Sequence, residues 1–203
     1  IPRYQEKALV SGLAFGGAGT AQATMGVAAG DADGDGATDL FVTNFHGESN
    51  SLYRQLRDGI FEDETLKRKL RQPSFSRLGF GTQFLDADLD GRLDLVVANG
   101  HIDNFSQDGR TDYQMRPQFF ANQGEAGFRE ADAETLGPFF DRRVLGRALA
   151  RLDWNGDGKE EFVVTHLDAP AARKHHEIIG ELHRSQIARR AIQSGCHWNC
   201  RAG

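Results

Sequence analysis

Short apolar runs alternate with polar, glycine-rich stretches along the first 172 residues of the chain. Three of these runs, at 40–43, 95–98 and 162–165, are rich in β-branched residues and are typical of buried strands. A further strand candidate precedes each run, at 25–29, 81–85 and 147–152. The pattern predicts an all-β fold built from short strands.

Each pair of predicted strands encloses the same acidic loop. The segments GDADGDGATDLFVTN, LDADLDGRLDLVVAN and LDWNGDGKEEFVVTH align without gaps, and their loops begin at Asp31, Asp86 and Asp153. Every loop has an acid or Asn at positions 1, 3, 5 and 9 and Gly at position 6. Three copies of a nine-position pattern identify an internal repeat.

The first two repeats share a later element, in which an aromatic strand turns at Gly59 or Gly124 into another strand. Four strands per unit, repeated in tandem, are typical of a propeller blade. Because propellers close with four to eight blades, we predict an incomplete β-propeller of about three four-stranded blades. The predicted parts are the end of a preceding blade and a link (1–22), blade 1 (23–66), blade 2 (67–131) with a surface insertion (100–115), a partial blade 3 (132–172) and a non-propeller C-terminal tail (173–203).

The loops have the ligand pattern of calcium sites. Calcium takes six to eight hard oxygen ligands, and alternating carboxylates point inward when such a loop curls. Ligands without His or Cys argue against zinc or copper. We therefore predict up to three Ca²⁺ sites: Asp31, Asp33, Asp35 and Asp39 with the Ala37 carbonyl; Asp86, Asp88, Asp90 and Asp94 with the Arg92 carbonyl; and Asp153, Asn155, Asp157 and Glu161 with the Lys159 carbonyl.

Two alternatives compete with this interpretation. An EF-hand opens in the same way but needs a bidentate Glu at position 12, where this chain has Val42, Val97 and Val164 inside predicted strands. A metal-free hairpin turn explains one acidic loop but not acids at four positions in three copies. Eleven of the 29 acidic residues occupy the ligand positions of these loops, and filling three sites takes the formal net charge from -5 to about +1.

Charge and composition limit the classes of partner and the functions that the sequence suggests. The net charge of -5 gives no reason to expect nucleic acid or an anionic membrane as partner. No apolar run approaches the ~20 residues of a membrane-spanning helix, and no secretory leader is visible. His101 and Asp103 lack a neighbouring nucleophile and are interpreted as structural. The basic link at 66–78 is interpreted as a solvated surface.

Together, MGVAAGDADGDGATDLFVTN, NSLYRQLRDGIFEDET, LGFGTQFLDADLDGRLDLVVANGHI and RALARLDWNGDGKEEFVVTHLDAP resemble the FG-GAP/VCBS repeat family over about residues 13–172. Within it, the chain is similar to cartilage-acidic-protein-like members, which pair such repeats with a C-terminal ASPIC/UnbV domain. The resemblance implies an integrin-α-like, non-catalytic propeller for adhesion or ligand contact. It would be secreted, periplasmic or on the cell surface.

The expected partners are an unidentified protein or carbohydrate ligand and the remaining blades of a longer chain. The alternative is the non-catalytic propeller portion of a larger secreted carbohydrate-processing or other hydrolytic enzyme. Two departures from the family pattern concern the third repeat. Asn155 and Glu161 replace the usual Asp, so we expect the weakest or least calcium-selective site there. His166 replaces the Asn of the other copies, Asn44 and Asn99, which we expect to cap or bridge strands.

The tail from about Arg173 loses the β pattern and holds both cysteines, Cys196 and Cys200. Back-translation with a one-nucleotide shift permits a strand-like sequence from Lys174 onward, which resembles the start of an ASPIC/UnbV domain. We therefore predict that this end is read in a shifted frame. A genuine helical tail is the alternative.

Overall fold

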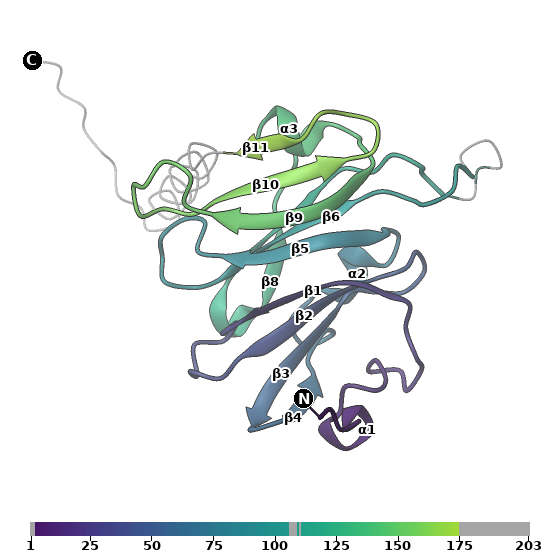
Figure 1. Ribbon diagram of the computed structural model, residues 1–203, viewed down its shortest axis with the longest axis vertical. Coiled ribbons are helices and arrows are strands. Elements are labelled where there is room, and N and C mark those ends of the chain that lie inside the picture. Colours follow the sequence, from purple (N-terminus) through teal and green to yellow (C-terminus); the bar gives the residue numbers. More distant parts are fainter. Residues whose placement is uncertain (1–2, 106–108, 110, 175–203) are drawn as a thin grey trace, which may run out of the picture.

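Three antiparallel sheets follow one another along the chain (Figure 1). They are seen in a computed structural model that describes residues 3–105, 109 and 111–174. The first sheet contains β1 (Thr24–Gly30), β2 (Asp39–Asn44), β3 (Ser51–Arg57) and β4 (Ile60–Asp63). The second contains β5 (Gly79–Leu85), β6 (Asp94–Asn99), β7 (Gln118–Asn122) and β8 (Phe128–Glu130). The third contains β9 (Gly146–Leu152), β10 (Glu161–His166) and β11 (Ala172–Lys174).

Within each sheet the strands pair in the order of the sequence, and every pairing is antiparallel. The first strands of the three sheets, β1, β5 and β9, lie side by side, and the sheets fan out from them (Figure 1). This is the arrangement of successive propeller blades, and it confirms the predicted all-β fold. Each acidic loop connects the first and second strand of its sheet.

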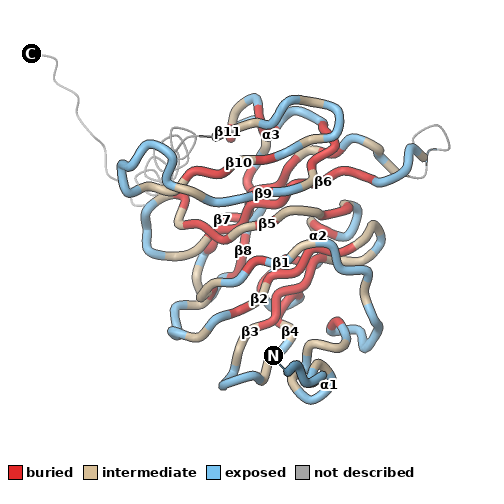
Figure 2. The backbone as a smooth tube through the Cα atoms, in the orientation of Figure 1, coloured by how far each residue is buried: buried red, intermediate tan, exposed pale blue. Residues whose placement is uncertain are grey.

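The core consists of two apolar layers, one between each pair of neighbouring sheets. Strand β6 shows why, since Leu95 and Val97 belong to the layer on the first-sheet side while Val96 and Ala98 belong to the layer on the third-sheet side. Successive strand residues point to opposite faces, so a strand between two sheets is apolar throughout. The buried backbone follows these strands from sheet to sheet (Figure 2).

The helices are short. α1 (Ala8–Ser11) precedes β1 and contacts β4, α2 (Arg71–Ser74) follows the first sheet, the 3-10 turn η2 (Gly124–Ala126) connects β7 to β8, and α3 (Pro138–Asp141) precedes the third sheet. No helix in residues 3–105, 109 and 111–174 has the length and apolar character needed to cross a membrane.

Three segments differ from their predicted structure. Residues 3–22 contain α1 and turns in place of the predicted strand of an earlier blade, because local bonds such as Ser11 N–H to Lys7 O (2.8 Å) satisfy the backbone. The insertion at 100–115 is anchored at a buried end, where Met115 pairs with Val144. The basic link is not a solvated surface throughout, since Leu70 and Arg68 are buried. The predicted frame shift concerns residues outside those described, apart from the start of the tail at 173–174.

Candidate metal centre

The first carboxylate of each loop holds the loop backbone in a curl. Asp31 accepts hydrogen bonds from the N–H groups of Gly34 (2.7 Å), Asp35 (3.1 Å) and Gly36 (2.9 Å). Asp86 and Asp153 cap their loops in the same way. The chain turns sharply at the sixth position, where Gly36 has a φ of 86° that favours glycine. The repeat therefore specifies one loop conformation.

The carboxylates or amide at positions 3 and 5 extend this network. Each accepts the N–H of the residue two positions later, at distances between 2.8 and 3.3 Å. The pairs are Asp35 to Asp33, Ala37 to Asp35, Asp90 to Asp88, Arg92 to Asp90, Asp157 to Asn155 and Lys159 to Asp157. These turns gather the acidic side chains on the inner side of each loop.

The acid at position 9 lies deeper than the others. Asp39 is 1% exposed and accepts N–H groups from Ala32 (2.9 Å) in its own loop and from Gln55 (2.8 Å) in β3. Asp94 repeats this pattern with Ala87 (3.2 Å) and Asn122 (2.8 Å). The ninth residue therefore joins the loop to the third strand of its sheet.

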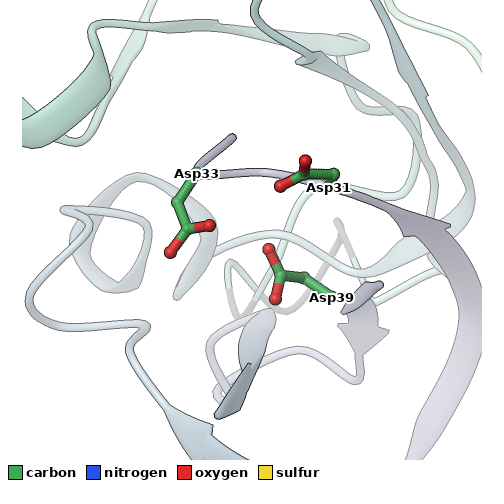
Figure 3. A group of neighbouring side chains, drawn as sticks. All are labelled: Asp31, Asp33 and Asp39. Atoms are coloured by element: carbon green, nitrogen blue, oxygen red, sulfur yellow. The ribbon is translucent and has the colours of Figure 1, made fainter. Parts of the chain in front are cut away.

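Two of the three loops bring acidic oxygens together. Asp31, Asp33 and Asp39 each place a carboxylate oxygen within 4.8 Å of the other two, and the three groups point toward a common centre (Figure 3). Asp86, Asp88 and Asp90 form the corresponding group in the second loop. Asp35 lies outside the first group and Asp94 outside the second. Among the described residues, the third loop forms no comparable group of three acidic side chains.

The deeper carboxylates have raised pKa values. Burial raises the pKa of Asp94 to about 8, and the neighbouring Asp88 and Asp90 add to the effect. Burial also raises the pKa of Asp39, again with help from two loop carboxylates. A bound dication reverses this situation because it stabilises the ionised form.

Arginine side chains contact the same carboxylates. Arg54 of β3 bonds to Asp33 and to Asp35 (3.0 Å to Oδ2). Arg92, at position 7 of the second loop, contacts Asp90. The pKa of Asp35 is lowered by the Ala37 N–H first and then by Arg54.

The residues of the first two loops fit calcium. Their donors are all oxygen, and in each loop three carboxylate oxygens lie within 4.8 Å of one another. The carbonyls of Ala37, Arg92 and Lys159 stay predicted ligands. The acidic pattern did not reveal Arg54, Arg68 or Asn122, which reach the loops only through strand pairing and sheet packing.

The predicted strand bridges at the end of the second strand are present. Asn44 donates to Ser51 Oγ of β3 (3.3 Å), and Asn99 donates to Gln118 Oε1 of β7 (3.1 Å). His166, at the same place in the third sheet, contacts Pro170 O (3.1 Å) through Nδ1. His101 is buried and meets the backbone of Asp103, in keeping with a structural role.

Comparison with known proteins agrees with this architecture. The model of the FG-GAP-like repeat matches residues 31–97, from the first acidic loop to the strand that follows the second loop. The curated proteins include no match to the chain. FG-GAP repeats form β-propeller blades, so fold and repeat together define a β-propeller-like module. Within it, residues 31–97 carry the FG-GAP-like repeat.

Proposed function

We propose that this chain is a calcium-binding, non-catalytic propeller module that acts in adhesion or ligand binding outside the cell. The observation that carries the proposal is the convergence of carboxylate oxygens in two loops whose first carboxylate accepts the same backbone N–H bonds from positions 5 and 6. Self-repelling carboxylates in a curled loop are stabilised by a dication. The location outside the cell follows from the resemblance to cartilage-acidic-protein-like proteins, which is itself part of the proposal.

The partner is an unidentified protein or carbohydrate. Support comes from the match to the FG-GAP-like repeat and from the architecture, in which loops extend from a rigid stack of sheets. Such loops are common sites of binding. The two acidic loops themselves serve to fix the geometry of the blades in this proposal.

Calorimetric titration of the whole chain with calcium tests the metal function. The unmodified chain should bind calcium at two sites or more, with a weaker third. The double variant Asp88→Asn with Asp90→Asn should lose one site, because it removes two charges from the second loop. The matched control is Asp58→Asn, which neutralises an exposed acid at the β3–β4 turn and should keep every site. A chain that releases no binding heat and shows no stabilisation with millimolar calcium would refute the proposal.

A further inference from the structure

Arg54 reaches the first acidic loop from a different part of the sheet. It lies on β3, and its guanidinium bonds through Nε to Asp33 and through Nη2 to Asp35 Oδ2 (3.0 Å). The side chain is 28% exposed. A single cation therefore neutralises two of the carboxylates that are predicted to bind calcium.

A second arginine near this loop is already committed elsewhere. Arg68 bonds through Nε to Glu64 Oε2 (2.7 Å) and through Nη1 to the carbonyl of Gly124 (3.3 Å). Its closest approach to Asp33 is 3.5 Å, and its side chain is only 7% exposed. Arg68 is thus held between the sheets, whereas the side chain of Arg54 is more exposed and lies 3.9 Å from Glu64 Oε1.

Among the described residues, no arginine on a strand of the second sheet forms an ion pair with a carboxylate of the second loop. Leu40 pairs with Tyr53 in the first sheet as Leu95 pairs with Phe120 in the second, so Arg54 corresponds to Ala121. The second loop instead has Arg92 within the loop itself, where it contacts a single carboxylate, Asp90. The two loops share backbone and ligands but differ in the source of their counter-charge.

We propose that Arg54 is the resident counter-ion of the first loop and that calcium must displace it, so that Arg54 sets the calcium affinity of this site. This inference rests on the proposed calcium binding. A positive charge bonded to two ligands opposes the entry of a dication and competes for the same oxygens. Calcium binding at this loop is an exchange of one cation for another, and the freed Arg54 moves toward solvent.

The test compares Arg54→Gln with Arg57→Gln by calorimetric titration of the full chain. Arg57 is an exposed arginine on the same strand and is absent from the ion pairs of the described residues. Arg54→Gln should tighten one calcium site about tenfold, which corresponds to about 1.4 kcal/mol. In chelator the same variant should melt at a lower temperature, because Asp35 loses its arginine partner and Asp33 keeps only the longer contact with Arg68. Arg57→Gln should change neither quantity.

The assignment to the first loop is checked by combination. In a chain that also carries Asp33→Asn and Asp35→Asn, Arg54→Gln should no longer change calcium binding. If Arg54→Gln folds poorly, NMR of the unmodified chain tests the same displacement through the Nε–H resonance of Arg54, which is assigned by its absence in Arg54→Lys. As calcium is added, the chemical shift of this resonance should move away from its hydrogen-bonded value.

The two proposals fail in different ways. Calcium binding that is unchanged or weaker in Arg54→Gln, or an Arg54 resonance that calcium leaves in place, overturns the counter-ion role while the metal function stands. No calcium binding by any variant or by the unmodified chain overturns both.

Discussion

Within the second loop, two aspartates have different structural roles. Asp94 is 3% exposed and accepts the N–H groups of Ala87 and Asn122, whereas Asp90 is exposed and bonds within its own loop and to Arg92. Removing an acceptor that satisfies buried donors costs about 1–3 kcal/mol. We therefore expect the ninth acid to stabilise the fold in addition to its proposed role as a calcium ligand.

Two substitutions distinguish the contribution of each aspartate to folding from its contribution to calcium binding. In chelator, Asp94→Ala should lower the free energy of unfolding by about 2–3 kcal/mol, because two N–H groups lose their acceptor. Asp90→Ala should change it by less than about 0.5 kcal/mol, as surface substitutions usually do. Both should abolish calcium binding at the second loop. Urea unfolding in chelator provides the measurement, and equal effects of the two substitutions would contradict the division of roles.

The third loop differs from the others in ligand charge. It has Asn155 at position 3, where the other loops have Asp33 and Asp88. Calcium affinity rises with the number of charged ligands. Titration of chains that keep only one intact loop should rank the third site weakest, and Asn155→Asp should tighten it. A third site that binds tightest without that substitution would disprove the ranking.

The sequence predicted the acidic residues of the sites but not the cations around them. Spacing along the chain reveals Asp31 and Asp33, because loop ligands are close in sequence. Arg54 and Arg68 lie 21 and 35 residues from Asp33, and they reach it through strand pairing and sheet packing. The basic composition of the link even favoured a solvated Arg68, although its guanidinium is buried against Glu64.

Among the elements, the first strands of the sheets approach one another most closely where a glycine is present. A Cβ added to Gly26 would overlap the carbonyl of Phe80, and one added to Gly81 would meet Leu149 N and, at 2.7 Å, Arg147 O. The two glycines occupy the third position of β1 and β5, and Ala148 occupies it in β9. The spacing of the sheets therefore depends on a missing side chain.

Gly81→Ala should force β5 and β9 apart and lower the free energy of unfolding by about 1–3 kcal/mol, the usual cost of overpacking. The matched control is Ala148→Val at the exposed equivalent position of β9. It should cost less than about 0.5 kcal/mol. Thermal unfolding of both variants measures the two costs. A Gly81→Ala variant as stable as the unmodified chain would show that β5 and β9 can separate without loss of stability.

The strand pattern predicted these elements well because alternation and turn residues are local signals. All runs preceding and following the loops lie within strands, and β6 was recognisable from its continuous apolar run. The described residues 3–22 contain no strand, and the end of a preceding blade stays a prediction, because a strand also needs a partner edge, which a local pattern does not reveal.

At the scale of the whole molecule, the end of the chain yields a prediction of its own. If the frame is shifted near Lys174, resequencing the gene between the codons for Pro170 and Lys174 should find a one-nucleotide difference. The reason is the abrupt loss of the β pattern together with the sudden appearance of both cysteines. An intact frame, with a peptide spanning His175 to Cys196 detected by mass spectrometry, would refute the shift.

Calcium should stabilise the whole described fold rather than a single loop, because the first loop is part of the junction between two sheets. Ala32, its second residue, is buried in the layer between the first and second sheets, and the side chain of Asn122 in β7 donates to its carbonyl (2.8 Å).

At a calcium concentration 100-fold above the dissociation constant, one site adds about 2.7 kcal/mol to the free energy of unfolding. For a chain of this size, each kcal/mol raises the melting temperature by about 2–4 °C. One cooperative transition should therefore move up by about 5–10 °C between chelator and millimolar calcium. Potassium chloride at equal ionic strength should produce little of this shift, because screening alone leaves the loop without a ligand-bound ion. A midpoint that calcium leaves unchanged would exclude a structural role for the metal.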